Sequence, residues 1–280
     1  MFNNKTVTSV DGVALNVRSF GNPAGQPILL VHGFAQSLWC WQKQFSAPEL
    51  QSFHLVAFDM RGHGQSDKPD VPAAYQSSNV WADDVAAVID GLGLENPLAV
   101  FWSYSGLVLC DYLRRYGDGA LSGMNFVSAR TKVGTPAAKE MSGTLFSDLV
   151  PGFCSADAVQ REAAVRLFLE NLTEGDIPDP DFYTMLGYNL AVPPHVCAAM
   201  LDRQVDNDDV LQRSTVPTLI THGNCDTSVL PLMAQHHERI MPQAELALWS
   251  NIGHAPFYED ADRFNTELAR FAIQCFRSEA

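Results

Sequence analysis

The chain has 280 residues, of which 46% are hydrophobic, and it carries 32 acidic against 18 basic side chains, a formal charge of −14. This length is enough to bury the core of one α/β domain, or of one domain with an insertion. A surface this acidic repels phosphate backbones and anionic lipid, which argues against nucleic acid and membranes as partners.

The start of the sequence and the cysteines bear on the cellular compartment. No basic segment followed by an apolar run opens the chain, so we expect no signal peptide, and no apolar run approaches the ~18 residues that span a bilayer. The six cysteines have no CxxC spacing, which favours buried free thiols in a reducing compartment over disulfides or zinc. These cysteines are Cys40, Cys110, Cys154, Cys197, Cys225 and Cys275. We therefore expect a cytoplasmic protein.

The first part of the chain predicts a hairpin and then alternating strands and helices. Polarity alternates on both sides of Asp11-Gly12, a pair typical of a two-residue hairpin turn. The hairpin strands are expected at 6–10 and 13–20, and unbroken apolar runs follow at 27–31, 54–58 and 97–101. Such runs suit strands that are covered on both faces. Helical patterns at 78–92 and 105–116 lie between them, which predicts crossover connections and a doubly wound sheet.

The alternation stops after a strand at 124–128. Residues 130–214 show helical patterns only, at about 137–149, 156–172, 181–190 and 194–204. The α/β pattern then resumes, with strands at 216–222 and 245–250 and helices at 230–240 and 262–276. We therefore expect a core domain built from residues 1–129 and 215–280, and a helical cap, or lid, formed by residues 130–214.

Three chemically suited side chains follow predicted strands. Ser103 ends one apolar run and opens a helix, Asp226 lies four positions after His222, and His254 follows the last strand. Ligands of open α/β sheets bind at the carboxyl ends of the strands, so these side chains are expected to meet. A hydroxyl, a base and an acid that orients the base are what nucleophilic acyl transfer requires.

Five motifs in the chain resemble the α/β-hydrolase superfamily. They are HGF (32–34), DMRGHGQSDKP (59–69), WSYSG (102–106), HGNCDTSV (222–229) and IGHAPFYED (252–260). The order serine, aspartate, histidine is also the order of that superfamily. The segment DYLRRYGDGALSGMNFVSA resembles its cofactor-free haloperoxidase and esterase branch.

The resemblance implies an α/β fold with a doubly wound, mostly parallel, eight-stranded sheet and an all-helical cap insertion. It implies Ser103 as nucleophile, His254 as general base, Asp226 as the acid that orients it, and no cofactor. The backbone N–H groups of Phe34 and Tyr104 would form the oxyanion hole.

Phe101 departs from the family pattern, because a small residue, usually glycine, stands two positions before the nucleophile. We expect an intact turn at Ser103, with the Phe101 ring buried beside the sheet. The alternative is a distorted turn that holds Ser103 out of register with His254.

The aromatic and methionine side chains suggest a pocket for a small-molecule apolar, uncharged substrate. The expected lining residues are Trp39, Trp102, Phe146, Phe153, Phe182 and Met185. No metal site is expected: His236 and His237 are adjacent and face apart on a helix, without a carboxylate at ligand spacing.

The sequence therefore predicts a serine hydrolase that cleaves an ester or lactone of a small to medium apolar substrate. Two alternatives stay open: the same triad used for perhydrolysis, cyanohydrin cleavage or carbon–carbon (diketone) hydrolysis, and a receptor-like ligand-binding protein with little turnover. Ser103 argues against the dehalogenases and epoxide hydrolases of this fold, whose nucleophile is aspartate. The sequence indicates neither the substrate nor the oligomeric state, which stays unknown.

Overall fold

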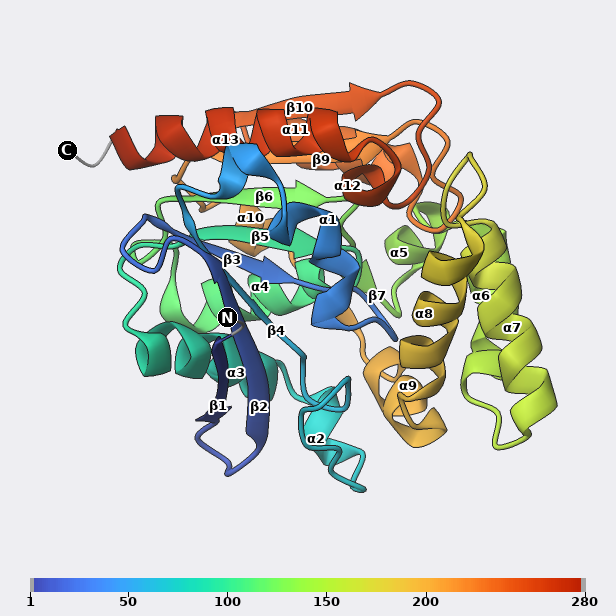
Figure 1. The fold of residues 1–280 in the computed structure, drawn as a ribbon. Coiled ribbons are helices and arrows are strands. Elements are labelled where there is room, and N and C mark those ends of the chain that lie inside the picture. The colour runs from blue at the N-terminus through green and yellow to red at the C-terminus, as the bar shows by residue number, and fades with distance from the viewer. Residues whose placement is uncertain (1–2, 278–280) are drawn as a thin grey trace.

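The computed structural model describes residues 3–277 and is built around one eight-stranded sheet (Figure 1). The strand order is β1-β2-β4-β3-β5-β6-β9-β10. The strands are β1 (Asn3–Thr8), β2 (Ala14–Gly21), β3 (Pro27–Val31), β4 (His54–Phe58), β5 (Leu98–Trp102), β6 (Gly123–Val127), β9 (Thr218–Gly223) and β10 (Ala244–Trp249). Every neighbouring pair from β4 to β10 is parallel, whereas the pairs β1–β2 and β2–β4 are antiparallel. The mostly parallel, doubly wound sheet expected from the sequence is confirmed.

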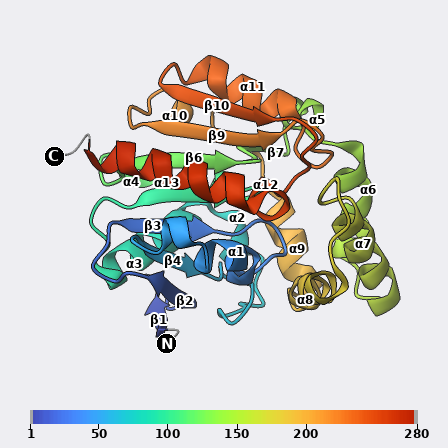
Figure 2. The same cartoon turned by 45° about the horizontal axis from the view of Figure 1, so that its top comes forward.

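The central strands are apolar on both faces because helices cover both faces of the sheet. Every residue of β3, β5 and β6 is buried. Helices α1 (Gln42–Phe45) and α13 (Ala261–Arg277) contact each other, and α13 crosses in front of the sheet in Figure 2. Helices α3 (Ser78–Leu92) and α4 (Ser105–Tyr116) pack together behind it. Both have the bounds that the sequence predicts.

Shorter elements complete the chain outside the strand pattern. They are the 3-10 helices η1 (Leu38–Trp41) and η2 (Pro48–Leu50), and helices α2 (Ala73–Gln76), α10 (Asp208–Leu211), α11 (Pro231–Ile240) and α12 (Pro256–Glu259). Of these, only α11 was expected from the sequence, because single helical turns are too short to show a periodic pattern.

The hairpin turn differs from the expected two-residue turn. Ser9 N donates to Val13 O at 2.8 Å, so residues 10–12 form a three-residue connection. The Asp11 carboxylate in this turn accepts a bond from Arg61 Nη1 at 2.8 Å. The longer turn thus carries an ion pair with a residue far away in the chain, which the sequence of the turn itself does not show.

Helices α5–α9 lie beyond the carboxyl ends of the strands, at the right of Figure 1. They are α5 (Pro136–Glu140), α6 (Thr144–Phe153), α7 (Ala158–Glu170), α8 (Asp179–Leu190) and α9 (Pro194–Leu201). Two corrections apply to this segment. It is not all-helical, because β7 (Lys132–Val133) pairs with β8 (Val205–Asp206) at its base. The helix expected at 137–149 is also two helices, because Ser142 forms a bridge with Val229 and Gly143 N donates to Ser228 O at 3.2 Å.

All six cysteines are free thiols. Four are buried as expected, but Cys154 and Cys225 are only partly buried. Within residues 3–277, no helix is long and apolar enough to cross a membrane.

Candidate active site

Ser103 lies in a strained turn between β5 and α4. Its φ is 57°, a left-handed conformation that costs a non-glycine residue on the order of 1 kcal/mol or more. The Ser103 carbonyl accepts bonds from Gly106 N at 3.0 Å and Arg130 N at 2.9 Å. Gly106 is needed here because a Cβ would lie 2.6 Å from the Arg130 carbonyl oxygen. The surrounding backbone therefore holds the strained residue in place.

Three side chains meet at this turn in a hydrogen-bonded chain. Ser103 Oγ lies 2.9 Å from His254 Nε2, and His254 Nδ1 lies 2.7 Å from Asp226 Oδ2. His254 follows β10, and the Trp102 indole N–H donates to its carbonyl oxygen at 2.9 Å. Asp226 follows β9. The three residues that the sequence singles out thus lie side by side, although 151 positions separate Ser103 from His254.

Asp226 is buried and held as a carboxylate. One oxygen accepts backbone bonds from Ser228 at 2.8 Å and Val229 at 2.9 Å, and the other contacts His222 Nε2 at 3.2 Å as well as His254. Burial alone would raise the pKa of Asp226, but the two histidines hold it well below its ordinary value. A charged Asp226 fixes the proton of His254 on Nδ1 and leaves Nε2 free to accept the proton of Ser103.

Phe101 does not distort this turn. Its side chain is fully buried in β5, where it pairs with Val31 and Phe126. The structure therefore agrees with the expectation of a formed turn with a buried ring.

Two backbone N–H groups beside Ser103 are candidates for an oxyanion hole. Phe34 and Tyr104 both line the cavity beside Ser103, and neither backbone N–H donates to an acceptor among the described residues. Gly33 lets the Phe34 segment approach, because a Cβ on it would lie 3.0 Å from Ser103 Cβ. These are the two donors expected from the sequence.

A cavity of about 640 Å³ opens over Ser103 and His254. Trp102 and Phe146 line it as expected, together with Phe168 and residues of α5 and α6. A volume of this size suits a medium-sized molecule.

Four of the expected lining residues are not in the wall of this cavity. Trp39 packs against Phe20 and the Arg18 guanidinium, which lies 4.7 Å from its ring. Phe153 lies behind the wall, with its ring centroid 5.4 Å from that of Phe34. Phe182 and Met185 pack within the helical segment, where Phe182 contacts Tyr183 and Arg166 and Met185 is 4% exposed. Contacts with β2 hold Trp39 elsewhere, and packing among the helices holds Phe182 and Met185, neither of which composition alone encodes.

The two positively charged residues of the cavity wall were missed. Arg130 lies three residues after the end of β6, so the strand-end argument that found Ser103 could have found it. Lys139 lies exposed on α5 at the cavity and gives no sequence signal.

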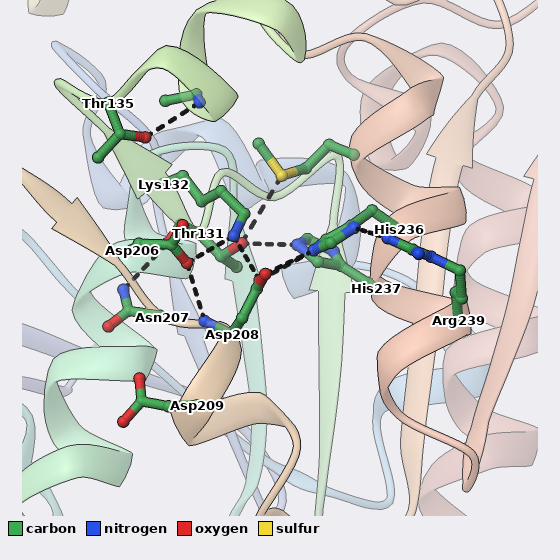
Figure 3. A network of polar contacts seen from close by, with 12 residues as sticks. Thr131, Lys132, Thr135, Asp206, Asn207, Asp208, Asp209, His236, His237 and Arg239 are labelled. Atoms are coloured by element: carbon green, nitrogen blue, oxygen red, sulfur yellow. Dashed lines mark hydrogen bonds and ion pairs between the residues drawn. The ribbon is translucent and has the colours of Figure 1, made fainter.

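A second polar cluster fixes the base of the helical segment (Figure 3). Lys132 Nζ contacts Asp206 and Asp208 at 2.5 Å each, and His236 Nε2 lies 2.9 Å from Asp208. His237 Nε2 lies 2.7 Å from the Thr131 hydroxyl. His236 and His237 thus contact Asp208 and Thr131, and no metal-ligand cluster of three His, Cys, Asp or Glu side chains occurs between residues 3 and 277.

Comparisons with known proteins agree with this geometry. The sequence model of the family described as alpha/beta hydrolase fold matches residues 26–261. The crystal structure of an esterase, RhEst1 from Rhodococcus sp. ECU1013, is similar with a TM-score of 0.89 and 37% identity, covering 96% of this chain and 98% of that one.

Two curated proteins are similar over nearly their whole length. The AB hydrolase superfamily protein YisY of Bacillus subtilis is 27% identical, over 95% of this chain and 98% of its own. The non-heme chloroperoxidase CPO-A1 of Kitasatospora aureofaciens is also 27% identical, over 94% and 98%.

Proposed function

The chain belongs to the α/β-hydrolase fold family and is an enzyme of it, and from that premise we propose that it is a serine esterase or lactonase acting through an acyl-enzyme on Ser103. The observation that carries this proposal is the contact of 2.9 Å between Ser103 Oγ and His254 Nε2, made at a strained turn that faces the cavity. Because the chain is an enzyme, the receptor-like alternative is set aside.

The proposed reaction starts with proton transfer from Ser103 Oγ to His254 Nε2 as Oγ attacks the substrate carbonyl carbon. The carbonyl oxygen becomes negative in the tetrahedral intermediate and accepts bonds from the N–H groups of Phe34 and Tyr104. Collapse expels the alcohol, which takes its proton from His254. Water then attacks the acyl-enzyme with His254 as base, releasing the acid and restoring Ser103.

Asp226 would keep His254 in the tautomer that this sequence requires and stabilise its protonated form. Helices α5–α9 would act as the cap, since α5 and α6 contribute residues to the wall of the cavity over Ser103. Apolar rings of Trp102, Phe146 and Phe168 would pack against the hydrocarbon part of the substrate.

Perhydrolysis is a second candidate, favoured by the similarity to a non-heme chloroperoxidase. It needs no new residue, because hydrogen peroxide would replace water in the attack on the same acyl-enzyme and release a peracid. Assays with and without peroxide on one ester would separate the two activities.

The test of the proposal is Ser103→Ala assayed on p-nitrophenyl esters of short and medium acids. We expect kcat to fall by a factor on the order of 10⁶, as for loss of a serine nucleophile elsewhere. Diethyl p-nitrophenyl phosphate should label wild type on the peptide that contains Ser103 and leave Ser103→Ala unlabelled.

Ser46→Ala is the matched control, because the Ser46 hydroxyl lies exposed and bonds only to Gln42 O at 3.4 Å. It should keep wild-type turnover and labelling. Near wild-type turnover by Ser103→Ala would overturn the proposed mechanism.

A further inference from the structure

Four basic side chains of the described residues are more than nine-tenths buried, and three of them contact carboxylates. Arg61 lies 2.8 Å from Asp11 and 2.7 Å from Asp84, and Arg203 lies 2.7 Å from Asp111. Lys132 contacts two aspartates, as described above. Burying a charge without a partner is costly, so such pairing is the rule in protein interiors.

Arg130 is the exception. It is 8% exposed, and no carboxylate of residues 3–277 lies within ion-pair distance of its guanidinium. Its hydrogen-bond acceptors are neutral: the Ser142 hydroxyl at 2.5 Å from Nη1 and the Ser228 carbonyl at 3.2 Å from Nη2. The Phe146 ring lies 5.4 Å from Cζ. A guanidinium has five N–H donors, so this environment leaves donor capacity toward the cavity that Arg130 lines.

The pKa values of the arginines reflect this contrast. Burial lowers the pKa of Arg130 to about 10, with only partial compensation from Asp226 and Tyr104. For Arg61, burial acts in the same direction, but Asp84 and Asp11 more than offset it and raise the pKa. An anion bound beside Arg130 would raise the pKa of its guanidinium, as these aspartates raise that of Arg61.

The wall of the cavity is basic although the protein is acidic. Arg130 and Lys139 line it, and no Asp or Glu does, in a chain with a formal charge of −14. Asp226 lies behind the wall, and its oxygens are already used by His254, His222 and two backbone N–H groups. The cavity therefore presents positive charge that the protein itself does not neutralise.

The backbone of Arg130 is held at a fixed position relative to the nucleophile. Arg130 N donates to Ser103 O, and Ser128, two residues earlier, has a strained φ of 42°. The next residues, Thr131 and Lys132, are anchored by the polar cluster of Figure 3. Strain and anchoring of this kind are typical of residues that are positioned for function.

We propose that Arg130 binds a carboxylate of the substrate, so that the enzyme prefers esters or lactones that also carry a free carboxylate, such as half-esters of dicarboxylic acids. This inference rests on the proposed function and replaces the uncharged substrate expected from the sequence. The carboxylate accepts paired hydrogen bonds from the guanidinium while the ester carbonyl reaches Ser103. Lys139 adds positive charge at the cavity, and the apolar rings pack against the connecting methylenes.

The test compares two esters of the same shape. One is the mono-p-nitrophenyl ester of adipic acid, and in the other an isopropyl group replaces the free carboxylate. We expect wild type to prefer the anionic ester about 30-fold in kcat/KM and Arg130→Gln to lose nearly all of that preference, which is in the range for a lost charge-assisted hydrogen bond. Arg130→Lys should keep an intermediate preference, because it keeps the charge but loses the paired geometry.

Arg213→Gln is the matched control, since it removes one positive charge from an exposed side chain of the α10 region, outside the cavity wall. Its preference should equal that of wild type. If Arg130→Gln does not fold, Arg130→Lys decides, with a preference below that of wild type expected.

A binding measurement separates this inference from the proposed function. Free adipate should raise the Tm of Ser103→Ala but not that of the double variant with Arg130→Gln. Hydrolysis of both esters without preference, or an equal loss on both in Arg130→Gln, would overturn the carboxylate site and leave the esterase standing. Arg130-dependent binding of adipate without hydrolysis of either ester would instead support the carboxylate site and overturn the esterase.

Discussion

Two buried aspartates follow the carboxyl ends of two strands of the same sheet, and each lies close to a histidine. Asp59 follows β4 and lies near His32, whereas Asp226 follows β9 and contacts His254. Burial would raise the pKa of both carboxyls, but histidine and hydrogen bonds lower it in both. The two clusters are therefore similar in composition and in the direction of the pKa shift of their carboxyl groups.

They differ in what the ring nitrogens of the histidine contact. His32 uses both nitrogens on backbone, with Met60 N 3.0 Å from Nε2 and Gly33 O 2.8 Å from Nδ1. His254 instead points Nε2 at Ser103 Oγ, beside an open cavity.

The oxygens of Asp59 also differ from those of Asp226, because their hydrogen-bond donors are not histidines. They are saturated by Ser37 Oγ, Leu38 N, Asn16 Nδ2 and Gln65 N, at 2.8 to 2.9 Å. A buried aspartate near a histidine is thus part of a structural cluster in one place and of a candidate catalytic device in the other. The contacts of the two histidine ring nitrogens make the difference.

Among changes to the two aspartate clusters, the largest effect is expected for Asp226→Asn. The amide cannot hold His254 in the required tautomer, so kcat should fall about 10⁴-fold while the fold is retained. Ester hydrolysis and the melting curve, measured on one preparation, check this. A loss of less than tenfold would show that Asp226 does not serve His254 in catalysis.

Asp59→Asn should lower stability and largely retain activity, which is the opposite of the outcome expected for Asp226→Asn. It replaces an acceptor of four donors by a group that itself donates, which should cost about 3 kcal/mol of unfolding free energy. The kcat per folded molecule should stay within about tenfold. Urea unfolding with active-site titration by the phosphate reagent separates the two quantities, and a loss of activity without a loss of stability would erase the contrast with Asp226.

The smallest effect concerns acid stability. His63 lies beside His32, with the two ring centroids 4.9 Å apart. Burial lowers the pKa of His63 to about 3, and it lowers the pKa of His237 to about 3 as well. The unfolded chain protonates these rings near pH ~6.5, so unfolding takes up protons between about pH 3 and 6.5 and stability falls as the pH falls through this window. The lowered pKa values of Asp59 and Asp226 add a further loss below pH ~4.

The measurement is the Tm between pH 8 and 4, in wild type and in His63→Gln. The variant should show a shallower fall of Tm, because one proton-binding ring is gone, while His237 still contributes. An unchanged slope in His63→Gln would mean that His63 does not titrate differently in the folded and unfolded states.

The sequence by itself determined the sheet and the positions of the candidate triad. Apolar runs at 27–31 and 54–58 coincide with β3 and β4, because strands covered on both faces must be apolar throughout. Ser103, Asp226 and His254 could be found because the carboxyl ends of parallel strands meet at one edge, whatever the distance along the chain.

The tertiary structure decided the walls of the cavity and the charge within it. Trp39, Phe153, Phe182 and Met185 are of the residue types that line apolar pockets, but their tertiary contacts place them outside the cavity wall. The sequence does not show that Arg130 lacks an acidic partner, because partners such as Asp84 for Arg61 lie far away in the chain. The alternation of strands and helices is a local pattern of the chain, so the parallel sheet could be predicted from it. The neighbours of a side chain between packed helices depend on the whole fold, so the cavity wall could not be predicted.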